Sequence, residues 1–144
     1  MTLFFDTTAL LALQVDSNSS ALFATEMNHD PVWAACAVAL AEAVSSINQL
    51  TDEPDAQVDL EDNLRRLWDY LYVVPVDQGC LDRASEITRE QPIRIADALH
   101  LAAADRLPAP LKYCTLDAAQ IPVAMALGFE VVSPQTELQI QWQT

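Results

Sequence analysis

Short apolar runs alternate along the chain with longer segments of helical spacing, and this alternation constrains the fold more than any other feature. The runs are rich in aromatic and β-branched side chains and end at polar residues or turns, which favours buried strands. They are residues 3–5, 31–36, 71–76, 111–116 and 129–132. The alternation predicts an α/β domain with a mainly parallel sheet of about five strands and helices on both of its faces.

Helices are predicted where apolar residues recur at helical spacing between prolines and polar residues. These segments are residues 7–15, 21–27, 38–50, 58–70, 81–90 and 97–107, and a short helix opened by Pro122 and closed by Gly128. For residues 38–50 the predicted inner face consists of Leu40, Ala43, Val44, Ile47 and Leu50. The acidic stretch 51–62 is predicted as a solvated loop or the start of the next helix.

The chain has 144 residues, enough for one domain with its own hydrophobic core. We expect residues 1–133 to form that domain and residues 134–144 to form a polar C-terminal tail. The two glycines, Gly79 and Gly128, stand far apart. Their spacing excludes the glycine-rich loops that bind nucleotide phosphates.

The charge of the chain limits its partners. Seven basic and 21 acidic residues give a formal net charge of −14. A chain with this charge is not expected to bind nucleic acid through a broad basic surface or to attach to anionic membranes. A polyanionic substrate would need metal ions or a local group of arginines to hold it.

The cysteines and the N-terminal segment indicate the compartment. Cys36, Cys80 and Cys114 contain no CxxC pair, which argues against a zinc ribbon or a redox dithiol. Cys36 and Cys114 lie in apolar stretches and are predicted to be buried. The N-terminus lacks the basic region of a signal peptide, and the longest apolar run, residues 32–41, is too short to span a bilayer. We therefore expect a cytoplasmic protein without membrane contact.

Four acidic residues are predicted to meet at one edge of the sheet. Asp6 and Asp117 end strands, and Glu42 lies in the first turns of the helix after the second strand. Asp97 opens a helix about 15 Å long, and the strand at 111–116 returns by about 15–20 Å. Because these lengths nearly cancel, Asp117 returns to the edge where Asp97 began. Ligand sites of parallel sheets lie at this edge.

Such a group of carboxylates points to a metal ion. Like charges a few ångströms apart raise one another's pKa values, and a divalent cation removes that cost. All-oxygen ligands suit Mg²⁺ or Mn²⁺. Such ions polarise a phosphoryl oxygen and lower the pKa of a bound water, as phosphodiester hydrolysis requires. The ion would also supply the positive charge that this acidic chain lacks.

Four segments carry a family resemblance: FFDTTALLAL, ALAEAVSSI, IRIADALHLAAAD and YCTLDAAQIPVAMALGFEVVSP. In order and spacing they resemble the acidic motifs of PIN-domain nucleases and, within that family, the small toxins of VapC-like toxin–antitoxin pairs. The resemblance covers nearly the whole chain. It implies a three-layer α/β/α sandwich, Mg²⁺- or Mn²⁺-dependent ribonuclease activity, frequent homodimers and inhibition by a partner antitoxin.

The resemblance also assigns roles to individual residues. Carried over by position, Asp6, Glu42, Asp97 and Asp117 match the metal-binding acids of the family. Thr8 matches a hydroxyl residue that supports the acidic site, and Thr115 is a similar candidate. The implied activity is an endoribonuclease in which metal-activated water hydrolyses RNA phosphodiester bonds, with one carboxylate orienting or deprotonating the water.

Each of these acids also has a purely structural interpretation. Asp6 and Asp117 are residue types that cap helices. Asp97 can complement the dipole of the helix that it opens, and Glu42 can belong to the polar face of its helix. The expected convergence of all of them at one edge favours a site.

Two neighbouring polar residues and one apolar cluster leave alternatives open. Arg94, one helical turn before Asp97, either contacts an RNA phosphate or pairs with Glu90. His100 is expected to be a hydrogen-bonded helix residue rather than a metal ligand. The cluster of Leu10, Leu11 and Leu13 belongs to the core or contributes to a dimer surface.

Rival functions come from other classes of protein. One is a non-cleaving PIN-like binding module whose acidic rim engages arginines of a protein partner, which the high negative charge motivates. A haloacid-dehalogenase-type phosphatase needs a second Asp two residues after the nucleophile, where this chain has Thr8. A response-regulator receiver has paired N-terminal acids, and Asp6 has no acidic neighbour.

Overall fold

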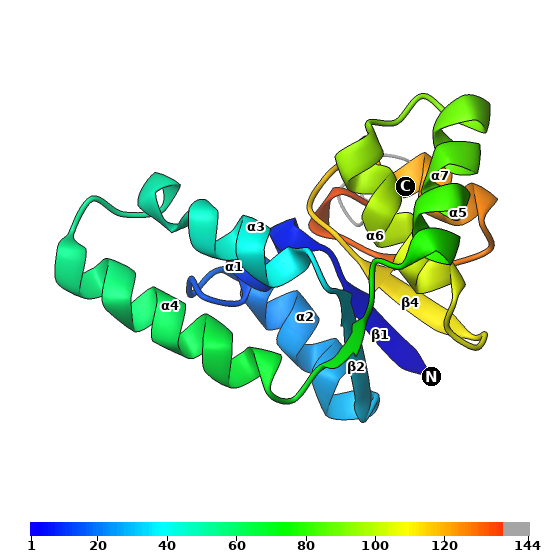
Figure 1. Cartoon of the computed structure of the whole chain (residues 1–144). Coiled ribbons are helices and arrows are strands. Elements are labelled where there is room, and N and C mark those ends of the chain that lie inside the picture. The colour runs from blue at the N-terminus through cyan, green and yellow to red at the C-terminus, as the bar shows by residue number, and fades with distance from the viewer. Residues whose placement is uncertain (137–144) are drawn as a thin grey trace.

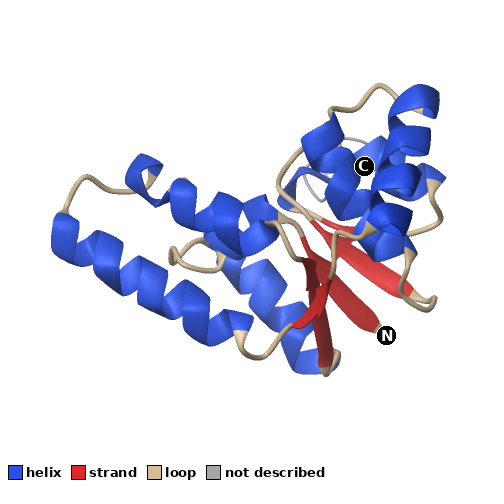
Figure 2. Ribbon diagram, viewed as in Figure 1, coloured by secondary structure: helices blue, strands red, loops and turns tan. Residues whose placement is uncertain are grey.

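A sheet of parallel strands runs through the middle of the protein (Figure 2). The computed structural model describes residues 1–136 of the chain. Within them the strands are β1 (Thr2–Phe5), β2 (Val32–Cys36), β3 (Tyr72–Val74), β4 (Leu111–Cys114) and β5 (Glu130–Val132). Their spatial order is β3-β2-β1-β4-β5, and each neighbouring pair is parallel. The predicted α/β class is therefore confirmed.

Helices cover both faces of this sheet, which makes the predicted three-layer α/β/α sandwich (Figure 1). One face carries α1 (Thr7–Ala12), α2 (Asn18–His29), α3 (Ala39–Ser45) and α4 (Pro54–Trp68), with a 3₁₀ turn at Ile47–Gln49. The other carries α5 (Gln78–Glu90), α6 (Ile95–Asp105) and α7 (Ile121–Ala126). Figure 1 shows α3 and α4 reaching away from the sheet as an antiparallel pair.

Alternate side chains of the central strands enter two separate cores. Phe4 and Tyr113 lie under α5, α6 and α7, with their rings stacked at a centroid distance of 5.5 Å. Leu3, Phe5 and Cys114 face α1–α4 instead. Successive residues of a strand point to opposite faces of the sheet. Because both faces are covered by helices, most strand positions are apolar on either face, which explains the short apolar runs in the sequence.

The order of the strands determines where a site can form. The chain passes from β1 to β2 and β3 on one side, and then crosses to β4 and β5 on the other. The carboxyl ends of β1 and β4 therefore flank the point where the strand order reverses, the usual place for a site in such sheets. The backbone N–H of Asp6 donates to the carbonyl of Cys114 at 3.2 Å, so the residues that leave these two strands are held together.

The predicted helix at residues 38–50 differs from the structure. α3 ends at Ser45, and the 3₁₀ turn follows. Ile47 is buried as predicted, but the tighter 3₁₀ winding changes the direction of later side chains. Leu50 is 42% exposed, so its predicted place on the inner face is wrong. The acidic stretch 51–62 is mostly helix, because Pro54 stands in the first turn of α4, where proline is well tolerated.

The predicted burial of Cys36 and Cys114 and the predicted helix end at Gly128 are confirmed by the structure. Cys36 and Cys114 are buried, as is Cys80, and none forms a disulfide. Gly128 follows α7 with a φ of 91°, a left-handed conformation that favours glycine and ends the helix. Every helix of residues 1–136 is too short or too polar to cross a membrane. Most of the predicted tail, residues 137–144, lies outside the described residues.

Candidate functional site

A cavity of about 320 Å³ opens at the carboxyl ends of β1 and β4. All four predicted acids line it, although they come from segments far apart in the sequence. The polar side chains around it are Asp6, Thr7, Thr8, Glu42, Ser45, Ser46, Gln49, Arg94, Asp97, His100, Asp117 and Gln120. The structure thus brings together the acids that strand and helix lengths place at one edge.

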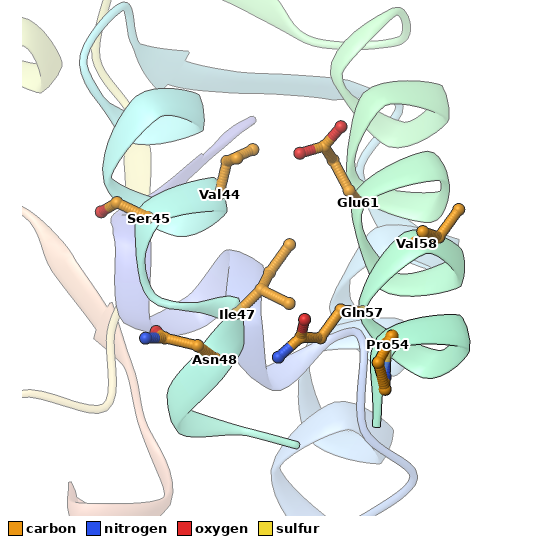
Figure 3. A pocket seen from close by; sticks show the side chains of 8 residues that line it. All are labelled: Val44, Ser45, Ile47, Asn48, Pro54, Gln57, Val58 and Glu61. Atoms are coloured by element: carbon orange, nitrogen blue, oxygen red, sulfur yellow. The ribbon is translucent and has the colours of Figure 1, made fainter. Parts of the chain in front are cut away.

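A second hollow lies between α3 and α4 (Figure 3). Its lining residues are Val44, Ser45, Ile47, Asn48, Pro54, Gln57, Val58 and Glu61, around a volume of about 390 Å³. Glu61 is the one charged residue among them. Since this hollow holds no group of titratable side chains, the acidic cavity is the better candidate for a site of reaction.

Asp6 is the most buried of the four acids, with 1% of its surface exposed. It follows β1 and caps α1, accepting the N–H of Ala9 at 2.9 Å and the hydroxyl of Thr8 at 2.7 Å on Oδ1. Its Oδ2 accepts the hydroxyl of Thr115 at 2.6 Å. Burial raises the pKa of Asp6, and the hydrogen bonds from Thr115 and Thr8 oppose that rise. The cap and the place in the cavity are thus compatible.

The two threonines join α1 to the loop after β4. Thr8 Oγ1 accepts the N–H of Leu116 at 2.9 Å while it donates to Asp6. Thr115 Oγ1 likewise accepts the N–H of Asp117 at 2.9 Å while it donates to Asp6. Each hydroxyl therefore orients the Asp6 carboxylate and ties it to the segment that carries Asp117.

Glu42 lies on α3 and shares one carboxylate oxygen with two neighbours. Its Oε1 accepts the hydroxyl of Thr7 at 2.9 Å and lies 2.6 Å from Nε2 of His100. The hydrogen bond from His100 lowers the pKa of Glu42, and burial partly offsets this effect. His100 is 2% exposed, and the prediction that it is a hydrogen-bonded helix residue is confirmed.

The other ring nitrogen of His100 determines the direction of this contact. Among the described residues, Nδ1 is buried without a hydrogen-bond partner. Burying an N–H without an acceptor costs more free energy than burying an unprotonated ring nitrogen without a donor. We therefore place the ring proton on Nε2, so that His100 donates to Glu42.

Asp97 lies in the first turn of α6 and pairs with Arg94. Its Oδ2 accepts from both Nε and Nη2 of Arg94 at 3.3 Å. The Asp97 side chain is 14% exposed, and that of Arg94 is 81% exposed. The predicted pairing of Arg94 with Glu90 is wrong. Pro92 separates the two, so that Glu90 ends α5 and Arg94 stands just before α6, and the spacing within one continuous helix does not apply.

Asp117 is held by the turn that follows it. Its Oδ1 accepts the N–H of Ala119 at 3.0 Å, and its Oδ2 accepts from Nε2 of Gln120 at 3.3 Å. α7 begins at Ile121 with Gln120 in the capping position, so the structural interpretation of Asp117 as a helix cap is wrong. Tyr113 donates its hydroxyl to Oε1 of Gln120 at 2.6 Å, which turns the amide nitrogen toward Asp117.

Sequence reasoning missed Thr7 and Gln120. Thr7 directly follows Asp6, but its partner Glu42 is 35 positions away. Gln120 stands three residues after Asp117, a spacing that suits a local side-chain contact and was the available signal. Its second partner, Tyr113, lies inside a strand and gives no such signal.

The donor chemistry of the cavity fits a hard divalent cation, because it offers carboxylate and hydroxyl oxygens. Among the described residues, Oε2 of Glu42 and Oδ1 of Asp97 accept no hydrogen bond and are available to an ion. Within residues 1–136 no three His, Cys, Asp or Glu side chains are arranged closely enough to hold a metal ion. Metal binding would therefore require side chains of the cavity to move closer together.

Replacement of His100 by Leu is expected to raise the pKa of Glu42. The change removes the donor that contributes most to the lowered pKa of Glu42, and the leucine side chain fills the buried position of the imidazole. A ¹³C NMR titration of the glutamate carboxyl carbons measures the pKa directly. Gln49→Ala, a change elsewhere in the cavity wall, is the control. An unaltered Glu42 titration in the His100 variant would show that the hydrogen bond has no electrostatic role.

The fold is similar to that of several solved structures, each at low sequence identity. FitAcB from Neisseria gonorrhoeae matches with a TM-score of 0.71 at 16% identity, over 92% of this chain and 98% of that chain. VapBC2 from Rickettsia felis, bound to a promoter DNA fragment, matches with a TM-score of 0.68 at 13% identity, over 92% of this chain and 98% of that chain. VapBC-5 from Mycobacterium tuberculosis is a member of the VapBC family of toxin–antitoxin systems. It matches with a TM-score of 0.64 at 19% identity, over 92% of this chain and 98% of that chain.

Sequence comparison gives the family. No curated protein sequence matches the chain significantly. The family model of the PIN domain matches residues 3–111, which is more than half of the chain. Asp6, Glu42 and Asp97 lie within the matched segment, and Asp117 lies beyond it. The chain therefore belongs to the PIN domain family.

Proposed function

We propose that the protein is a Mg²⁺- or Mn²⁺-dependent endoribonuclease and the toxin of a toxin–antitoxin pair. The observation that carries this proposal is the convergence of Asp6, Glu42, Asp97 and Asp117 on one cavity. PIN domains are generally nucleases, which supports the same reaction class. The four acids come from α3, α6 and the ends of β1 and β4, so that only the folded chain assembles them.

In this proposal the four carboxylates hold one or two ions. When bound, such an ion polarises the phosphoryl oxygen, lowers the pKa of a water and offsets the charge of the substrate. Thr8 and Thr115 keep the oxygens of Asp6 in place, and His100 and Thr7 keep Oε1 of Glu42 in place. Rigid support of this kind reduces the reorganisation that the reaction requires.

The reaction is a direct hydrolysis. One carboxylate of the cavity orients the attacking water or accepts its proton as the new phosphorus–oxygen bond forms. The phosphorus–oxygen bond to the leaving sugar breaks, and that oxygen takes up a proton from solvent. No side chain becomes covalently attached to the substrate. Arg94, whose side chain lines the cavity, contacts a phosphate of the RNA.

The proposed partners and location follow from several separate observations. VapBC-5 is named as a member of the VapBC family of toxin–antitoxin systems, which supports a protein antitoxin as the partner of this chain. A homodimer is also proposed, with the partly buried Leu11 and Leu13 as candidates for its surface. Three buried, unpaired cysteines suit a reducing cytoplasm, where RNA is available.

A non-cleaving protein-binding module remains the second candidate. The net charge of −14 favours it, as do the internal partners of Glu42 and Asp97. Its acidic rim would bind arginines of a protein partner in place of an ion. Metal dependence separates the two functions, since the binding module requires neither Mg²⁺ nor Mn²⁺.

Incubation of the purified protein with total RNA tests the proposal. We expect cleavage with Mg²⁺ or Mn²⁺, loss of cleavage with EDTA, and recovery when the ion is added in excess. An Asp6→Asn protein purified in parallel controls for contaminating nucleases. Intact RNA in the presence of either ion would refute the nuclease and favour the binding module.

A further inference from the structure

We propose that Arg94 exchanges partners during the reaction cycle: it pairs with Asp97 in the metal-free protein and turns to an RNA phosphate when Asp97 binds the ion. This inference rests on the proposed function and adds a regulation to the same site. In the metal-free protein the guanidinium of Arg94 partly neutralises Asp97, as the ion does later. Once the ion is bound, Arg94 contacts the substrate.

The geometry of the pair suits such an exchange. Both contacts of Arg94 go to Oδ2 of Asp97 at 3.3 Å, which is long for a charge-assisted hydrogen bond. The Arg94 side chain is 81% exposed and that of Asp97 is 14% exposed, so that an exposed cation lies over a largely buried anion. Arg94 stands at the capping position before α6 and makes no side-chain cap, so its side chain can move without loss of a helix contact.

Arg94 also has a special place in the charge distribution of the cavity. It is the one Arg or Lys among the lining residues. His100 is buried and directed at Glu42, so it cannot reach a substrate. A polyanion that enters this cavity in a chain with a net charge of −14 therefore meets a single exposed cationic side chain. That side chain is committed to Asp97 until an ion takes its place.

The exchange couples ion binding to RNA binding. An exposed ion pair such as Arg94–Asp97 favours the paired state by roughly two- to fivefold. The attraction of Asp97 to an ion with two charges is stronger, so the ion displaces Arg94. Release of Arg94 then favours RNA only when the ion is present. Since coupling between two ligands is reciprocal, bound RNA also strengthens retention of the ion.

Replacement of Arg94 by Ala separates the two roles, because they change in opposite directions. By calorimetric titration, Arg94→Ala is expected to bind Mn²⁺ roughly two- to fivefold more tightly than the wild type, since no internal cation competes at Asp97. In cleavage of a short single-stranded RNA, the same variant is expected to raise KM about tenfold, with a smaller change in kcat.

Two further variants serve as controls. Arg94→Lys keeps the charge but not the two-pronged geometry, and it is expected to restore KM only in part. Arg66→Ala removes the same charge from α4, where Arg66 contacts Asn63 and does not line the cavity. This variant is expected to keep the wild-type values for Mn²⁺ affinity and KM.

The outcomes distinguish this inference from the proposed function. Tighter Mn²⁺ binding together with a higher KM supports the exchange. Unchanged or weaker Mn²⁺ binding by Arg94→Ala overturns it, even where the wild type cleaves RNA. An unchanged KM overturns the phosphate contact. A wild type that binds Mn²⁺ without cleaving RNA refutes the nuclease, while the Mn²⁺ titration still tests the competition at Asp97. A wild type that does not bind Mn²⁺ refutes both.

Discussion

Asp6→Asn is expected to abolish RNA cleavage and, at neutral pH, to make the metal-free protein more stable. Loss of one ion-binding carboxylate removes about a thousandfold or more of the rate. The stability effect comes from burial, which raises the pKa of Asp6 in the folded state. A raised pKa favours the protonated acid, so its contribution to stability is present at low pH and is lost as the pH rises through the folded value. Asn has nearly the same shape and stays neutral.

Urea unfolding over a pH series in EDTA measures this difference. The gap in free energy of unfolding between Asp6→Asn and the wild type is expected to widen as the pH rises from acid to neutral. Asp59→Asn, which removes one exposed charge from α4, is the control for the change in net charge. A variant that is less stable than the wild type at neutral pH would show that the hydrogen bonds to Thr8 and Thr115 outweigh burial.

Mn²⁺ at about 100 times its dissociation constant is expected to stabilise the wild type by about 2.7 kcal/mol, because the ion binds only the folded state. Asp97→Asn is expected to lose most of this stabilisation together with RNA cleavage. The side chain of Asp97 is largely buried and belongs to the cavity, so an amide there removes charge without a change in size. Thermal unfolding with and without Mn²⁺ gives the shift, and Asp59→Asn should retain it.

Two results would contradict this expectation. Undiminished Mn²⁺-dependent cleavage by Asp97→Asn would remove Asp97 from the site. A wild type whose unfolding midpoint does not respond to Mn²⁺ or Mg²⁺ would favour the protein-binding module. Since the first result concerns a residue and the second concerns the function, the pair of measurements separates an error in the site from an error in the activity.

The sheet and the place of the acids could be predicted from the sequence because both depend on local patterns. Most strand residues are apolar because helices cover both faces of the sheet, and each strand therefore lies in a short apolar run. Asp6 and Asp117 follow two such runs, and the length of α6 against that of β4 places Asp97 at the same edge. Parallel strands then require these residues to share one side of the molecule.

The partners of these acids could not be predicted, because they are contributed by distant segments. The contact of Glu42 with His100 joins residues 58 positions apart, and it exists only once the fold has brought α3 and α6 together. The partner of Arg94 depended on where Pro92 breaks the helix, which decides between Glu90 and Asp97. Leu50 likewise turned outward because α3 tightens into a 3₁₀ turn that no apolar spacing indicates.

The hydrogen bond between Asp6 and Thr115 spans 109 positions and has a consequence during translation. β1 leaves the ribosome well before β4, which lies beside it in the folded sheet. A nascent chain without β4 and the segment after it therefore lacks Thr115, which donates to Asp6, and Asp117, which lines the same cavity. In the proposed ribonuclease toxin, this order of synthesis would delay activity until the segment after β4 has emerged and docked beside β1.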